Sequence, residues 1–256
     1  MLKNRVIPAL LLQSGGLVKT RKFRDPVYVG DPVNAIRIFN EKEVDELMVL
    51  DIRASREGLE PNFALIEKFA GECFMPLTYG GGVRTLEQAG RLFALGVEKI
   101  SVQTSALENL SIVREVSDKF GSQSIVVSVD VERGFFGSPR LRKCASGKTA
   151  DVPWLEFAQR AVAAGAGEIL LNAVHKDGTL SGPDLPLVTQ ASRALSVPLI
   201  ALGGVASLDD IRKCVDAGAS AVAAGAFFVY HGPYRAVLIT YPAFADLESV
   251  LGNKNA

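Results

Sequence analysis

Four short turns in this sequence contain residue types that bind phosphate. Two are runs of glycine at 80–82 and 203–204, and two are the segments Gln-Thr-Ser at 103–105 and Ala-Gly-Ala at 224–226. Glycine lets backbone N–H groups approach an anion closely, and the N-terminus of a following helix adds a partial positive charge. One such turn is weak evidence, because glycine in a turn often serves only a steric purpose. Four of them indicate two phosphate sites, and hence a long ligand that is phosphorylated at both ends.

An internal repeat relates these turns to one another. Pro-Leu-Thr-Tyr-Gly-Gly-Gly-Val at 76–83 matches Pro-Leu-Ile-Ala-Leu-Gly-Gly-Val at 198–205. Two further pairs of segments match in the same order, 47–51 with 169–172 and 6–11 with 125–130. The second half of the chain is therefore predicted to be a diverged copy of the first, with half-repeats at about 1–121 and 122–245.

Short apolar runs of strand type alternate along the chain with amphipathic stretches of helical length. The strand candidates are residues 6–12, 47–52, 77–79, 99–102, 125–131, 168–172, 199–202 and 221–224. Eight such strands, each followed by a helical pattern, predict a parallel sheet that closes into a barrel. A flat doubly wound sheet is the alternative, but it seldom uses eight strands in two equal halves. We expect an α/β protein with a single (β/α)8 TIM barrel domain over residues 1–256, built from two (βα)4 half-repeats, with a frayed tail at 253–256.

The composition narrows the classes of function. The chain has 256 residues, of which 48% are hydrophobic, and its 28 Lys and Arg balance its 28 Asp and Glu. No overall field therefore attracts nucleic acid or an anionic membrane, so a charged ligand must be bound by local groups. Three cysteines without metal-ligand spacing indicate reduced thiols rather than a disulfide framework or a zinc site. With no leader-like start and no apolar run of membrane-spanning length, we expect a soluble cytoplasmic protein without metal or cofactor.

The barrel also predicts where the four turns lie. They follow the third, fourth, seventh and eighth strand candidates, and the active site of such a barrel is built at the C-terminal ends of its strands. The turns after strands three and four would face those after strands seven and eight. Two phosphate sites on opposite sides of one mouth are the result.

The sequence resembles the HisF family, the cyclase subunit of imidazole glycerol phosphate synthase, over essentially the whole chain. The matching segments are 50–55 (Leu-Asp-Ile-Arg-Ala-Ser), 80–83 (Gly-Gly-Gly-Val), 120–123 (Phe-Gly-Ser-Gln), 165–171 (Gly-Ala-Gly-Glu-Ile-Leu-Leu) and 177–179 (Asp-Gly-Thr). The resemblance implies a barrel that docks a glutaminase on its N-terminal face, giving a heterodimer active in histidine biosynthesis. It implies that ammonia passes through the barrel to a bisphosphorylated substrate (PRFAR) and that the products are imidazole glycerol phosphate and AICAR.

The resemblance also implies a set of substrate-binding residues. One phosphate site would be lined by Gly82, Gln103 and Thr104, and the other by Asp177, Gly178, Gly203, Ala224 and Gly225. Lys19 would clamp the substrate from the mobile loop after strand one, and Asp51 would lie among the substrate-binding groups. Family members commonly have Asn where Gln103 stands, so the first site is slightly altered.

One catalytic position departs from the family pattern. The family mechanism resembles a two-carboxylate scheme of general acid–base catalysis, with one Asp at the end of strand one and one at the end of strand five. The strand-five residue is present as Asp130, but its repeat mate in strand one is Leu11, which can neither donate nor accept a proton. Either another carboxylate substitutes, with Asp51 the nearest candidate, or the chain is a paralogue whose cyclase step is impaired.

Four charged residues lie at the opposite ends of the strand candidates. Arg5, Glu46, Lys99 and Glu168 match the ring that family members use as an ammonia gate at the bottom of the barrel. Salt-bridged strand starts that serve stability alone are the alternative interpretation. Glu46 and Asp51 are five residues apart, so strict alternation puts them on opposite faces, and we expect a turn or bulge before strand two.

Three functional hypotheses follow. The first is a HisF-type cyclase subunit, a lyase, that works with a HisH-like glutaminase. The second is an ammonia-relay subunit that feeds a separate amidating enzyme, for instance one that modifies a nucleotide-linked or surface sugar. The third is the sister phosphosugar isomerase that shares the repeat; it has no use for an ammonia gate.

Overall fold

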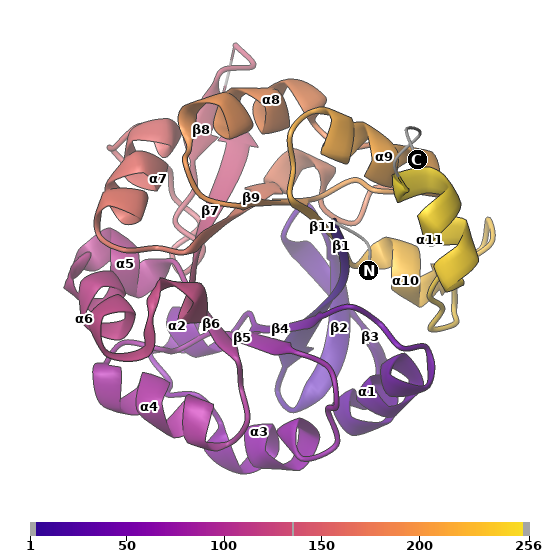
Figure 1. The fold of residues 1–256 in the computed structure, drawn as a ribbon, viewed down its shortest axis with the longest axis horizontal. Coiled ribbons are helices and arrows are strands. Elements are labelled where there is room, and N and C mark those ends of the chain that lie inside the picture. The colour runs from indigo at the N-terminus through magenta and orange to yellow at the C-terminus, as the bar shows by residue number, and fades with distance from the viewer. Residues whose placement is uncertain (1–3, 135, 253–256) are drawn as a thin grey trace.

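Eight parallel strands close into a barrel that is surrounded by helices (Figure 1). The computed structural model describes residues 4–134 and 136–252, so the expected tail at 253–256 lies outside the described residues. The barrel strands, in order around the ring, are β1 (Arg5–Gln13), β4 (Leu47–Asp51), β5 (Leu77–Gly80), β6 (Lys99–Val102), β7 (Ile125–Arg133), β9 (Glu168–Ala173), β10 (Leu199–Leu202) and β11 (Ala221–Ala224). The parallel pairing of β11 with β1 closes the ring. The predicted (β/α)8 barrel is therefore confirmed, and each predicted strand agrees with an observed one to within two residues at either end.

Helices cover the outside of the barrel and connect successive strands (Figure 1). The longer ones are α1 (Pro32–Glu41), α3 (Phe63–Ala70), α4 (Leu86–Ala94), α6 (Ser111–Phe120), α7 (Trp154–Ala163), α8 (Leu185–Ala194), α9 (Leu208–Asp216) and α11 (Phe244–Leu251). The short ones are α2 (Ala54–Glu57), α5 (Thr104–Glu108), α10 (Ala226–Val229) and the 3-10 turns η1 (Ser122–Ser124) and η2 (Val174–Lys176). The two helices that follow the glycine runs begin in the same way. Thr85 caps α4 and Ser207 caps α9, each accepting a hydrogen bond from the third backbone N–H of its helix.

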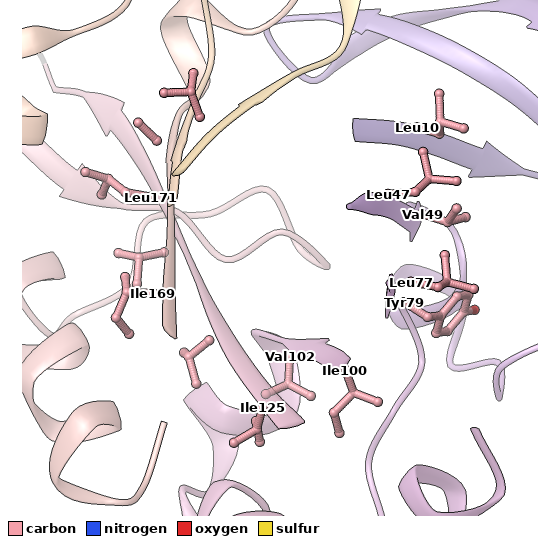
Figure 2. Close-up of a cluster of buried hydrophobic side chains, with 14 of the residues drawn as sticks. Leu10, Leu47, Val49, Leu77, Tyr79, Ile100, Val102, Ile125, Ile169 and Leu171 are labelled. Atoms are coloured by element: carbon pink, nitrogen blue, oxygen red, sulfur yellow. The ribbon is translucent and has the colours of Figure 1, made fainter. Parts of the chain in front are cut away.

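Side chains on the barrel strands alternate between two apolar layers. The outer layer packs under the helices, and Figure 2 shows Leu47 and Val49 of β4 beside Leu77 and Tyr79 of β5 in this layer. The inner layer fills the barrel with the side chains of Ile7, Ala9, Met48, Val126, Leu170, Ile200, Ala221 and Ala223. A strand with both faces buried reads as a continuous apolar run, which is why these strands were predictable from sequence.

Of the expected turn or bulge before β4, the chain shows a turn at residues 42–43, but no bulge separates Glu46 from the strand. Met48 and Leu50 contact the inner layer, and Glu46 lies on the same face because it continues their alternation. The registers of β4 with β1 and with β5 run without a shift. The irregularity lies at the other end, where Asp51 ends the strand and accepts hydrogen bonds from the backbone N–H groups of Arg53 and Ala54. The two carboxylates therefore lie at opposite ends of the barrel.

Three antiparallel additions lie beyond the C-terminal ends of barrel strands and were not predicted. A hairpin of β2 (Gly16–Arg21) and β3 (Arg24–Gly30) extends from β1. The short strand β8 (Pro139–Leu141) folds back on β7, and β12 (Tyr230–His231) pairs with β13 (Ala236–Val237) after α10. These additions stand around the mouth of the barrel, where they can shape access to it.

Candidate active site

A cavity opens at the C-terminal ends of the barrel strands. Its lining includes all the residues that the sequence assigned to catalysis and substrate binding at the mouth: Lys19, Asp51, Gly82, Gln103, Thr104, Asp130, Asp177, Gly178, Gly203, Ala224 and Gly225. Ser128, Cys144, Asn172 and Thr20 line it as well and were missed by the sequence analysis. Two of these, Ser128 and Asn172, lie on strand candidates at inward positions, so the alternation could have identified them.

Glycine is required at the two opposed turns. Gly82 has φ of 76°, and a Cβ there would lie 2.7 Å from the carbonyl oxygen of Leu59. Gly203 has φ of 109°, and a Cβ there would lie 2.8 Å from the carbonyl oxygen of Ala173. Left-handed backbone and close packing both exclude other residues at these positions. Because steric need alone explains both glycines, they permit a phosphate site at each turn without proving one.

Asp130 is the buried carboxyl group of the mouth. It lies near the end of β7, and its Oδ2 accepts a hydrogen bond of 2.7 Å from Nε2 of Gln103. Burial raises the pKa of Asp130 to about 7, while hydrogen bonds from Gln103 and Asn172 act in the opposite direction. A carboxyl group with this pKa exchanges a proton readily at neutral pH, which is the property that a general acid–base catalyst needs.

Gln103 links Asp130 to the segment after β8. Its amide nitrogen donates to Asp130, and its Oε1 accepts a hydrogen bond of 2.7 Å from the backbone N–H of Cys144. The thiol of Cys144 lies 3.3 Å from the hydroxyl of Thr104, and burial raises the pKa of that thiol to about 11. The side chain of Gln103 is therefore held between Asp130 and the backbone of Cys144, through both ends of its amide. The thiol stays protonated at neutral pH and is a weak nucleophile.

Lys19 lies on a strand rather than in the loop that the sequence analysis expected. It is on β2, its side chain is buried, and its Nζ donates a hydrogen bond of 2.5 Å to the carbonyl oxygen of Ala9. Burial lowers the pKa of Lys19 to about 8, and the nearby charge of Asp177 acts in the opposite direction. Its Nζ occupies the space where a side chain at Gly225 would be. The structure thus brings this cation to the turn after β11, as the clamp requires, but from a hydrogen-bonded hairpin.

Asp177 holds that hairpin in place. Its Oδ2 accepts hydrogen bonds from the hydroxyl of Thr20 at 2.7 Å and from the backbone N–H of Phe23 at 3.1 Å. The backbone N–H of Lys22 donates to its carbonyl oxygen at 2.9 Å. Burial raises the pKa of Asp177, although the hydrogen bonds from Thr20 and Phe23 oppose the shift. The side chain that the sequence analysis assigned to the second phosphate site thus accepts hydrogen bonds from the hairpin.

Leu11 lies on an apolar wall of the same mouth. It lines the cavity together with Leu50 of β4 and Leu202 of β10. Leu11 pairs with Leu50 across β1 and β4, whereas the repeat mate of Leu11, Asp130, pairs with Asn172 across β7 and β9. One side of the mouth is therefore apolar and the other is polar. The nearest alternative carboxylate, Asp51, accepts two backbone hydrogen bonds at the start of α2 and so is held as a cap.

The four charged residues at the other end of the barrel form a closed ring. Arg5 donates to Glu46 at 2.5 Å and to Glu168 at 2.9 Å. Lys99 completes the ring, with its Nζ 3.0 Å from Glu46 and 3.3 Å from Glu168. Burial lowers the pKa of Arg5, but the charges of Glu168 and Glu46 outweigh it and the net shift is upward. The Arg5–Glu46 pair joins the neighbouring strands β1 and β4, but the other three pairs join strands that are not neighbours, so the ring spans the barrel interior.

Across 4–134 and 136–252, no group of three or more His, Cys, Asp or Glu side chains is arranged to hold a metal ion. Within the same ranges, no helix combines the length and the apolar character needed to cross a membrane.

Comparison with known proteins agrees with this architecture. The family model described as "Histidine biosynthesis protein" matches residues 5–235. A Pseudomonas aeruginosa protein, named provisionally as imidazole glycerol phosphate synthase subunit hisF2, is 53% identical over 253 residues, covering 97% of this chain and 99% of the relative. A Vibrio vulnificus protein, with the provisional name imidazole glycerol phosphate synthase subunit hisF3, is 47% identical over 256 residues, covering 98% and 97% of the two chains.

A third relative carries the family name without qualification. The imidazole glycerol phosphate synthase subunit HisF of Streptococcus sanguinis (strain SK36) is 38% identical over 232 residues, covering 91% of this chain and 92% of the relative. The family model and these relatives each span most of the chain. The chain therefore belongs to the HisF family of histidine biosynthesis proteins, a family of enzyme subunits.

Proposed function

We propose that this chain is a HisF-type cyclase subunit that uses ammonia from a glutaminase partner and acts on a bisphosphorylated substrate (PRFAR). One observation carries the proposal: a closed ring of charges lies at one end of the barrel, and a cavity with two opposed glycine turns lies at the other. A barrel that only bound a phosphosugar would need the cavity with its glycine turns but not the ring of charges. The products would be imidazole glycerol phosphate and AICAR.

The mouth supports binding of two phosphates. Gly82 and Thr104 stand on one side of the cavity, and Gly203 and Gly225 stand on the other. Lys19 adds a positive charge to the second side, where its Nζ lies beside Gly225. A buried ammonium group beside exposed backbone N–H groups favours a dianionic phosphate. We propose that the substrate spans the mouth between these two sides.

Asp130 would act as the general acid–base residue in this reaction. Ring closure and fragmentation need protons to be moved on opposite sides of the substrate, and Leu11 occupies the position from which a second carboxylate would act. Loss of one positioned acid–base group typically lowers a rate by ~10²–10⁴. We therefore expect cyclase activity that is present but greatly reduced.

The test is turnover of the bisphosphorylated substrate with an ammonium salt, which removes the need for a glutaminase. The wild-type protein should turn over far more slowly than a typical enzyme, and Leu11→Asp should raise the rate by at least tenfold. Leu202→Asp is the matched control, because it adds a carboxylate to the same apolar wall at another strand, and it should leave the rate low. A wild-type rate of roughly 1–10³ per second would show that strand one needs no carboxylate.

The apolar position of Leu11 above an intact ring favours a second candidate function. A subunit that only relays ammonia to a separate amidating enzyme, for example in nucleotide-sugar or surface-polysaccharide synthesis, needs the ring and the barrel interior but no second acid–base group. This alternative predicts that Leu11→Asp does not restore cyclase turnover. It also predicts that product forms when a glutaminase and an amidating enzyme are supplied together with this chain.

The glutaminase would dock on the N-terminal face of the barrel, forming a heterodimer. The ring opens on that face, and the side chain of Phe74, 86% exposed, lies on the same face in the connection before β5. An exposed aromatic side chain is a common anchor of protein interfaces. We place the complex in the cytoplasm, where glutamine-dependent biosynthesis takes place.

A further inference from the structure

The side chain of Asn172 places an unpartnered amide oxygen in the mouth. Asn172 ends the inward face of β9, lines the cavity and is only 6% exposed. Its amide nitrogen contributes a hydrogen bond to Asp130. Its Oδ1 is buried and has no hydrogen-bond partner within residues 4–134 and 136–252. A buried acceptor without a partner is costly, so this oxygen is expected to serve a ligand.

Two further hydrogen-bond acceptors lie on the neighbouring strand β7. Asp130 lies directly across from Asn172 in the pairing of β7 with β9. Ser128 is two residues earlier on the same face of β7, and its hydroxyl lies 3.5 Å from Oδ1 of Asp130. Two cations of this region have other partners: Arg142, whose charge lowers the pKa of Asp130, pairs with Glu132, and Lys19 donates to the backbone of Ala9. The group therefore offers oxygen atoms to a small molecule that carries several N–H donors.

The cluster lies where the barrel interior meets the mouth. The ring of Arg5, Glu46, Lys99 and Glu168 closes the far end, and the apolar inner layer fills the barrel between the two. Only a small neutral molecule can cross an apolar interior at low cost, because a charged one would lose its hydration. The cluster supplies the first carboxyl group beyond that layer.

We propose that Asn172, Asp130 and Ser128 form a holding site for ammonia at the point where it leaves the barrel interior. This inference rests on the proposed use of ammonia and adds a site where ammonia is bound before it reacts. Oδ1 of Asn172, the hydroxyl of Ser128 and the carboxyl group of Asp130 each accept one N–H bond. Leu11 and Leu50 offer no such group on the opposite wall, and Leu202, which pairs with Asn172, offers none beside it, so ammonia is held at β7 and β9.

A reversible proton transfer to the held molecule follows from the same geometry. The carboxylic acid form of Asp130 gives its proton to the lone pair of ammonia; an O–H bond breaks, an N–H bond forms, and ammonium and carboxylate result. When an electrophilic carbon reaches the site, the proton returns to Asp130 and frees the lone pair for attack. Because burial brings the pKa of Asp130 to about 7, both directions are accessible at neutral pH.

The test is an NMR titration of the full chain that needs no turnover. The side-chain amide signal of Asn172 and the carboxyl carbon signal of Asp130 are followed with ammonium chloride, at constant pH and ionic strength. Potassium chloride and tetramethylammonium chloride serve as comparison salts, since neither cation has an N–H group. We expect saturable shifts of both signals with ammonium alone. Equal shifts with potassium, or none with ammonium, would overturn the proposal and leave Oδ1 of Asn172 to a water molecule.

Single substitutions test which residues produce the ammonium-dependent shifts. Asn172→Leu should abolish the ammonium shift at Asp130, and Leu50→Val, at the repeat mate of Asn172, should keep it. If Asn172→Leu does not fold, Ser128→Ala serves instead and should weaken the response at least threefold; an unchanged response in Ser128→Ala would then overturn the proposal. Titration of the same samples with inorganic phosphate separates the two claims. Loss of the phosphate response counts against the proposed function, whereas retained phosphate binding without an ammonium response counts against the holding site alone.

Discussion

At the scale of single residues, the mouth contains one carboxyl group with a raised pKa, Asp130, and a leucine, Leu11, at the matching position of the repeat. The repeat made the absence of a second carboxyl group visible from sequence, because Leu11 and Asp130 occupy matching positions. The raised pKa of Asp130 could not be predicted from sequence, since it depends on burial and on hydrogen bonds from Gln103, just after β6, and from Asn172 on β9. Gln103 illustrates the same limit: the sequence placed it beside a phosphate, whereas its side chain joins Asp130 to Cys144.

The pKa of Asp130 predicts a pH-dependent contribution to stability. Burial raises it from 3.8 to about 7, so the folded state binds this proton more tightly than the unfolded state does. The contribution is fully present below about pH 3.8 and is lost as the pH rises through about 7. The Asp130→Asn variant has no proton to lose at this position. The free energy of unfolding of the variant minus that of wild type should therefore increase between pH 4 and 7, by a few kcal/mol at most. Urea unfolding at both pH values measures the difference, and a constant difference would show that Asp130 is not tuned.

Lys19 predicts a pH-dependent affinity for phosphate. Its pKa is lowered to about 8 by burial, so the side chain is charged at pH 7 and mostly neutral at pH 9. Affinity for inorganic phosphate should therefore fall between these values in wild type. Lys19→Met should bind more weakly at pH 7 and change little up to pH 9. Calorimetric titration provides the measurement, with Lys213→Met on the exposed face of α9 as the control. Parallel curves for wild type and Lys19→Met would remove Lys19 from the site.

At the scale of elements, the barrel strands were predictable and the additions at the mouth were not. The strands are apolar on both faces, which produces a strong signal over four to nine residues. The hairpin of β2 and β3 has no such pattern, because most of β3 is exposed and Lys19 and Thr20 are buried only against the mouth. The hairpin is held by hydrogen bonds to Asp177, which is distant in the sequence, and local sequence patterns do not predict such contacts.

Thr20→Val should loosen the hairpin while keeping its shape. The substitution removes the hydrogen bond of 2.7 Å to Asp177 and leaves a buried carboxyl oxygen with one donor fewer. The expected loss of stability is about 1–3 kcal/mol. Hydrogen exchange should quicken at the amide of Phe23, which donates to the same oxygen, and stay unchanged at strand β6. Unchanged exchange at Phe23 would mean that Asp177 does not anchor the hairpin.

At the scale of the whole molecule, the barrel separates two polar ends by an apolar interior. The ring lies at the N-terminal ends of the strands and the mouth at their C-terminal ends, so a ligand at one end cannot touch groups at the other. The sequence anticipated this separation through strand order and through charges at the strand starts. It misjudged the face on which Glu46 lies, because it counted from Asp51, where the strand ends. The division into two half-repeats stays a prediction.

The last prediction concerns coupling between the two ends. Lys99 is buried and contacts both Glu46 and Glu168, so removing its charge leaves two buried carboxylates that share Arg5 alone. Such a loss typically costs 3–5 kcal/mol, roughly, and it should change how the ring opens. With a glutaminase and an ammonia acceptor reconstituted, Lys99→Met should lower the ratio of product formed to glutamine hydrolysed. Phosphate affinity at the distant mouth should not change, and Lys213→Met, on the exposed face of α9, should behave as wild type in both measurements. If Lys99→Met kept the wild-type ratio while remaining folded, the ring would be a structural salt-bridge cluster, and the proposed route of ammonia through the barrel would lose its main support.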